Sequence, residues 1–206
     1  SVDTLCIGGG YNEDDSEIDL RSGKIGIHMH SHNGLAIGSF NGDALIDISD
    51  KCKLELTVSG IKVTGIGSCK GIATISSSAD IAISCTGAQA VAIGSLEDGE
   101  GSIYIKSGNL MMKMRSAKNS AIGAIKGNMN TRVENADISI DSEGDEITGI
   151  GDALGTGNVA IIDSAVTMKI LAANPKDIGT GSGDLKIVNS TVSSLINNKV
   201  ITHSNI

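Results

Sequence analysis

The stretch Gly65-Ile66-Gly67-Ser68 decides the fold, because its Ile-Gly pair returns at nearly constant spacing along the chain. The pair occurs seven times, with its glycines at Gly8, Gly38, Gly67, Gly94, Gly123, Gly151 and Gly179 and intervals of 30, 29, 27, 29, 28 and 28 residues. A period of about 20 to 50 residues is the signature of a solenoid. The sequence therefore predicts a single elongated domain over residues 1–206, with repeats that start near positions 7, 37, 66, 93, 122, 150 and 178.

The repeat between Gly38 and Ile66 shows how one coil is built. Apolar and polar residues alternate over 44–48, 54–58 and 61–66, and turn-forming Ser, Asp and Gly residues lie between these segments. Alternation with a period of two indicates half-buried β-strands, and no stretch has the 3.6-residue period of a helix. We therefore predict an all-β fold with three short strands in each coil. Residues 196–206 are expected to form a C-terminal cap or tail.

The recurring isoleucine and glycine have different structural roles. When coils stack about 4.8 Å apart, an inward isoleucine lies directly above its equivalent and forms a continuous apolar ladder. The glycine after it permits a positive φ or a close backbone contact at a corner, where any side chain would be repeated in every coil. We therefore interpret the seven glycines as structural repeat positions rather than as parts of an active site.

The Ile-Gly pair, the Gly-rich loop after it and the alternating strands resemble the parallel β-helix family. More narrowly, they are similar to the Gly-rich β-helix repeats of bacterial surface proteins, over about residues 5–195. This resemblance implies a right-handed parallel β-helix of about seven coils of 28–29 residues, since crossovers between parallel strands are usually right-handed. Left-handed β-helices and leucine-rich repeats have other sequence patterns. Because many unrelated functions occur on one fold, the resemblance predicts structure better than activity.

Composition and charge argue against two classes of partner. The net charge is −8 and the chain has only three arginines and three aromatic residues, whereas nucleic-acid binding needs a clustered basic face and rings for stacking. No run of eighteen apolar residues is present, so no membrane span is expected. The chain opens inside a repeat at Ser1, which indicates a fragment of a larger protein.

The cysteines leave the cellular compartment open. Cys6, Cys52, Cys69 and Cys85 form no ladder and no C-x-x-C pair, so we expect buried or half-buried small apolar side chains. Unpaired cysteines favour a cytoplasmic location. The resemblance to surface repeats instead favours the cell surface or secretion.

Three histidines form the sharpest local motif. His28, His30 and His32 alternate with Met29 and Ser31, so the imidazoles are expected on one outward side of a strand, about 7 Å apart. Imidazoles at this spacing are candidate ligands for zinc or copper. The alternative is that they are solvent-facing polar residues of one coil, because the other coils have no equivalent histidines.

Acidic residues in three loops raise the question of calcium. They are Glu13, Asp14, Asp15 and Glu17; Glu97, Asp98 and Glu100; and Asp141, Glu143, Asp145 and Glu146. Calcium needs six to eight converging oxygens, about 2.3–2.6 Å from the ion, whereas the first two loops are expected three coils apart. We interpret all three as solvated loops and expect no required cofactor.

A row of outward residues on the first strands is the candidate ligand-binding surface. The expected row is Asp47, Thr74, Tyr104, Arg132, Ala160 and Lys186. Within it, Tyr104, Arg132 and Asp47 offer a ring, a cation and a carboxylate to a ligand. The leading hypothesis is a non-catalytic module that binds an extended ligand, such as a polysaccharide, on this outer face.

Two alternatives stay open. Solenoid ends expose unpaired strands, so the chain could instead serve protein interaction or oligomerisation, as an end-to-end or side-by-side homodimer attached to an upstream regulator or adhesin. A polysaccharide lyase or glycosidase would need paired carboxylates about 5–10 Å apart or a basic residue beside a metal-bound acid. The expected row provides neither arrangement.

Overall fold

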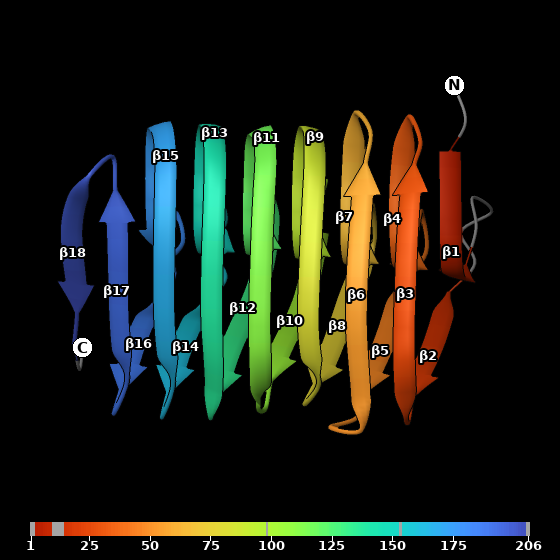
Figure 1. The fold of residues 1–206 in the computed structure, drawn as a ribbon, viewed down its shortest axis with the longest axis horizontal. Helices are drawn as coiled ribbons and strands as arrows, with labels where there is room; N and C mark the ends of the chain where they lie inside the picture. Colours follow the sequence, from red (N-terminus) through yellow and green to blue (C-terminus); the bar gives the residue numbers. More distant parts are fainter. Residues whose placement is uncertain (1–2, 10–14, 98, 153, 205–206) are drawn as a thin grey trace.

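The chain winds into a parallel β-solenoid of about seven turns (Figure 1). The computed structural model describes residues 3–9, 15–97, 99–152 and 154–204, and these residues include no helix. Two sheets run along the axis, and equivalent strands of successive coils pair in parallel. The predicted fold class is confirmed.

The first strands of the coils form one sheet, which we name the short sheet. Its seven strands in the described residues are β2 (Ser16–Leu20), β5 (Ala44–Ile48), β8 (Ile72–Ser77), β10 (Gly99–Ile105), β12 (Gly127–Glu134), β14 (Val159–Ile162) and β16 (Leu185–Val188). Every neighbouring pair is parallel.

The remaining strands form a second sheet, which we name the long sheet. In the described part of the chain it comprises β1 (Asp3–Gly9), β3 (Gly23–His30), β4 (Asn33–Ser39), β6 (Cys52–Ser59), β7 (Lys62–Ser68), β9 (Asp80–Ser95), β11 (Gly108–Ala124), β13 (Ala136–Asp152), β15 (Ala165–Ile178), β17 (Thr191–Ile196) and β18 (Lys199–His203). Among the described residues, separate second and third strands, as predicted, occur in the two coils with β3–β4 and β6–β7. In the next four coils they merge into one long strand, because pairing continues through the corner that a turn was expected to occupy.

Ladders of apolar side chains fill the interior. Ile37, Ile66, Ile93, Ile122 and Ile150 are in register and fully buried, as the repeat predicted. Each buried isoleucine of this size contributes about 1.5–3 kcal/mol relative to an exposed one. In the described residues, the main core consists of aliphatic, methionine and cysteine side chains, and each isoleucine of the ladder packs against its equivalents in neighbouring coils.

The corner glycines make the close stacking sterically feasible. Gly38, Gly67, Gly94 and Gly123 have φ angles between 132° and 140°. A Cβ at Gly94 would lie 1.9 Å from the carbonyl oxygen of Gly123 in the next coil. The position therefore excludes side chains both by backbone conformation and by contact.

The last coil is covered by an antiparallel strand. β18 pairs with β17 in antiparallel orientation, from Val192↔His203 to Ile196↔Lys199. The Nε2 atom of His203, on β18, lies 2.7 Å from Oδ2 of Asp177. Asp177 is the residue before the last Ile-Gly pair. Burial favours the neutral form of Asp177, but hydrogen bonds from His203 and the Ile178 backbone N–H outweigh it and hold the Asp177 pKa below its usual value.

We predict that Gly94→Val lowers the free energy of unfolding by more than about 2 kcal/mol, because it combines a strained φ with a backbone clash. Gly179 has a φ of 116° but open space around its would-be Cβ, so Gly179→Val should show the conformational strain alone and cost less. Gly26→Val, with neither feature, should change stability by less than about 0.5 kcal/mol. Chemical unfolding of the three variants checks this order, and equal stability would contradict the stacked-corner account.

We predict that His203→Ala lowers the free energy of unfolding at pH 6.5 by about 2 kcal/mol, because it leaves the buried Asp177 carboxylate without its main side-chain donor. Since the folded-state pKa of Asp177 is lowered, its stabilising effect is present above about pH 4 and is lost as pH falls further. That acid-dependent loss should shrink in His203→Ala. Thr202→Ala, on the exposed side of the same strand, is the control, and an equal effect there would rule out the ion pair as the cause.

Candidate functional site

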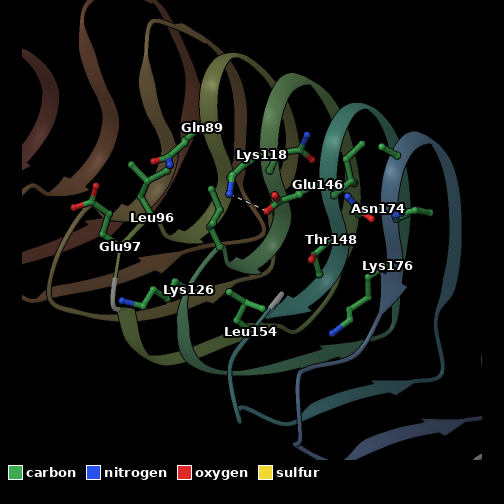
Figure 2. Close-up of a pocket in the computed structure, with 15 residues that line it drawn as sticks. Gln89, Leu96, Glu97, Lys118, Lys126, Glu146, Thr148, Leu154, Asn174 and Lys176 are labelled. Carbon is green, nitrogen blue, oxygen red and sulfur yellow. Dashed lines mark ion pairs between the residues drawn. The ribbon is translucent and has the colours of Figure 1, made fainter.

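A groove of about 850 Å³ runs along the solenoid between the corner of the long sheet and the loops that follow the Ile-Gly pairs (Figure 2). It is lined by Gln89, Leu96, Glu97, Lys118, Asn119, Ile125, Lys126, Glu146, Ile147, Thr148, Leu154, Ala173, Asn174, Pro175 and Lys176. Its volume is typical of ligand-binding clefts, which measure about 300–1,000 Å³. The sequence did not predict it.

One wall of the groove is a row of polar side chains in strict register. Gln89, Lys118, Glu146 and Asn174 come from β9, β11, β13 and β15 and occupy equivalent positions in four successive coils. Lys118 Nζ lies 3.0 Å from Glu146 Oε2. At the usual spacing between strands, the row extends over roughly 14 Å.

The opposite wall consists of loop residues. Leu96 and Glu97 follow β9, Ile125 and Lys126 follow β11, and Leu154 follows β13. Glu97 forms an ion pair with Lys62 from an earlier coil. Leu154 is 78% exposed, so this wall presents apolar as well as charged surface.

The position that Leu35 occupies in an early coil holds other residues in the coils that form the groove. Near the N-terminal end, Leu35 and Phe40 are buried with Cys69 and half-buried Leu5 in a small separate apolar cluster. The register continues this position through Thr64, Val91, Ser120, Thr148 and Lys176. Of these, Thr148 and Lys176 line the groove, whereas Thr64, Val91 and Ser120 are fully buried.

A fully buried carboxylate lies at the base of two groove loops. Asp152 accepts hydrogen bonds from the backbone N–H groups of Ala124, at 2.9 Å, and Met129, at 2.7 Å. These donors flank the segment that carries Ile125 and Lys126. Burial raises the pKa of Asp152 to about 6, although the backbone donors lower it.

The row expected to bind ligand lies on the short sheet and forms a network of its own. Tyr104 donates a hydrogen bond to Glu134, which also pairs with Arg132. The cations of Lys106 and Arg132 each lie 5.7 Å from the centre of the Tyr104 ring. Hydrogen bonding to Glu134 raises the pKa of Tyr104. The ring and hydroxyl of Tyr104 are therefore engaged within the protein, which limits the sugar stacking expected of them.

The structure corrects one member of this row and connects another. The residue in register between Asp47 and Tyr104 is Ser76, not Thr74. Asp47 accepts a hydrogen bond from Ser76 at 2.6 Å, and Lys106 Nζ lies 3.8 Å from its carboxylate. Asp47 thus reaches the Tyr104 network through Lys106.

The three histidines do not form a cluster. His28 and His30 are exposed on β3, while His32 lies in the bend before β4. His30 Nδ1 is 2.9 Å from Ser59 Oγ on the neighbouring strand. Among the described residues, no group of three or more His, Cys, Asp or Glu side chains is arranged to hold a metal ion.

The third predicted acidic loop is part of strand β13, and half of the described acidic residues of the three segments form ion pairs. Asp141 and Glu143 both bind Arg115, at 2.8 Å and 3.5 Å, and Glu146 binds Lys118. Glu13, Asp14 and Asp98 lie outside the described residues. These pairs on the long sheet are half-exposed and each is worth at most about 1 kcal/mol.

The cysteines are free thiols with different surroundings. Cys52, Cys69 and Cys85 are buried, as expected, but Cys6 is exposed. Burial raises the pKa of Cys69 to about 11 and that of Cys85 to about 12. These two thiols therefore stay protonated near neutral pH and are unsuited to nucleophilic chemistry.

Comparison with protein-family models, curated proteins and solved structures finds no match to this chain. Within the described residues there is also no helix capable of crossing a membrane.

We predict that Glu134→Ala lowers the pKa of the Tyr104 phenol, because it removes the carboxylate that stabilises the protonated hydroxyl while Lys106 and Arg132 remain beside the ring. The test is an ultraviolet absorbance titration in a Tyr11→Phe background, where Tyr104 is the one remaining tyrosine. Glu143→Ala, which removes a carboxylate from the other sheet, is the matched control. An unchanged phenol pKa in Glu134→Ala would show that the network does not form in solution.

Proposed function

We propose that this chain is a non-catalytic binding module and that it holds an extended ligand, such as a polysaccharide, in the groove between Gln89 and Lys176. The observation that carries this proposal is the groove itself, a hollow that continues across four coils of a regular stack. The site proposed from sequence, the surface of Tyr104, Arg132 and Asp47, is the competing location.

The groove lining has the chemistry that an extended polar polymer needs. Gln89 and Asn174 supply amide donors and acceptors at its two ends, and Lys118 with Glu146 supplies an ion pair between them. Apolar side chains such as Ile125 and Leu154 lie on the facing wall, where they can contact the less polar faces of sugar rings. Repetition of similar groups at a fixed spacing favours a ligand that also repeats.

Two features support binding over catalysis. The groove carboxylates Glu97 and Glu146 are each paired with lysine, whereas a general acid or nucleophile needs a carboxyl group that is available to substrate. They also belong to coils that are two layers apart, and each faces its own lysine. The resemblance to Gly-rich repeats of bacterial surface proteins further supports a surface polymer as ligand.

We predict that calorimetric titration of the purified chain with neutral and acidic polysaccharides finds a binding partner, and that Ile125→Trp weakens it by about tenfold or more, or about 1.4 kcal/mol, by filling the groove. Tyr104→Ala, on the short sheet, should leave the affinity unchanged. Circular dichroism and thermal unfolding confirm that both variants are folded.

The reverse pattern, with loss in Tyr104→Ala alone, would place the site on the Tyr104, Arg132 and Asp47 surface. Absence of binding across the whole panel would contradict a polysaccharide ligand. The exposed Leu154 would then favour a protein segment as the occupant of the groove.

A further inference from the structure

The carboxyl group of Asp152 connects two loops that form one wall of the groove. Its Oδ1 accepts from Ala124 N–H, and its Oδ2 accepts from Met129 N–H. The backbone N–H of Gly157, in the loop after β13, is a third donor. One loop carries Ile125 and the other carries Leu154, so a single side chain fixes the positions of both groove residues.

Asp152 is an exception within its own repeat position. The equivalent residues in register are Ser39, Ser68, Ser95 and Ala124. The Ser39 hydroxyl accepts a hydrogen bond from Gly42 N–H within its own loop, at 3.0 Å. Ser68 Oγ also contacts two loops, since it donates to the carbonyl oxygens of Gly42 in the preceding coil, at 3.5 Å, and of Lys70, at 2.6 Å. Asp152 differs in that its carboxylate has two oxygens that both accept from backbone N–H groups, and it lies in one of the four coils that form the groove.

We propose that the protonation state of Asp152 sets the arrangement of the groove wall, so that the groove binds its ligand in a pH-dependent manner. Only the pH dependence of ligand binding rests on the function proposed above. The link between the protonation state of Asp152 and the groove wall concerns the protein without ligand and is tested separately.

The chemistry follows from the donor set. An ionised carboxylate only accepts hydrogen bonds, and three backbone N–H groups point at it. After protonation one oxygen becomes a hydroxyl that needs an acceptor of its own, and the hydrogen bonds from the three N–H groups lose their charge assistance, so the loops that they hold are bound less tightly. The charged group beside the carboxylate is Lys176 on β15, whose ammonium favours ionisation. Because burial raises the pKa of Asp152 to about 6, protonation takes place between about pH 7 and pH 5.

The first experiment follows the wild-type chain by NMR between pH 4.5 and pH 8. We expect the backbone amide signals of Ala124, Met129 and Gly157 to shift with one shared midpoint near pH 6. The methyl signals of Ile125 and Leu154 should shift with the same midpoint, because the groove wall moves with its anchor. Asp152→Asn should remove this titration, while Asp137→Asn, an exposed change on the same strand, should retain it.

Amide signals that do not titrate in the wild type, or that titrate equally in Asp152→Asn, would overturn the proposal. Amides that titrate without any response at Ile125 and Leu154 would also overturn it, because the carboxyl group would then not control the wall. These readouts need no ligand, so they stand even if the polysaccharide panel finds none.

The second experiment measures the affinity for the polysaccharide found by calorimetry at pH 7.5 and at pH 5. We expect binding about tenfold weaker at pH 5 in the wild type, and equally weak binding at both pH values in Asp152→Asn. Equal affinity at the two pH values in the wild type would overturn the regulatory half of the proposal. It would leave the binding function itself intact.

Discussion

Backbone hydrogen bonding between equivalent positions of successive coils is the constraint on which the rest of the structure depends. It fixes the distance between layers at about 4.8 Å, so every residue contacts the residues at the same position above and below it. A residue is therefore tolerated at a given position only if it can pack directly against the equivalent residues of the neighbouring coils. This explains the isoleucine ladder inside the stack, and it explains why Gly67 and Gly94 meet through backbone atoms alone at the corner.

Where the strands stop, side-chain oxygens continue the same bonding. Asp43 Oδ1 accepts from Ile72 N–H at 2.9 Å, and Asn130 Oδ1 accepts from Asn158 N–H at 3.0 Å. Asn158 Oδ1 in turn accepts from Asp184 N–H at 2.8 Å. The Asp and Asn residues that read as ordinary turn formers in the sequence thus connect one coil to the next. Asp152 belongs to this group, but it is buried and serves three donors instead of one or two.

The periodicity of the sequence was sufficient to predict the class of fold, the number of coils and the inward residues of most strands. It failed where a polar residue occupies an inward position. Ser77 is fully buried at the position of Ile48 and Ile105, and Ser76 rather than the predicted Thr74 lies in register with Asp47 and Tyr104. The merged strands were missed because nothing in the repeat shows whether pairing continues through a corner.

The groove could not be predicted for a different reason. Its lining residues come from several coils and two sides of a corner, so no single sequence motif marks it. One row that contributes to it runs through Leu35, Thr64, Val91, Ser120, Thr148 and Lys176, and these residues can be aligned only when the register is known. A feature that repeats in every coil of a regular stack cannot mark one coil as a binding site. Specificity must then come from positions that depart from the repeat. In this chain, departures at Lys176 and Asp152 occur beside the same groove, which is why we place its function there.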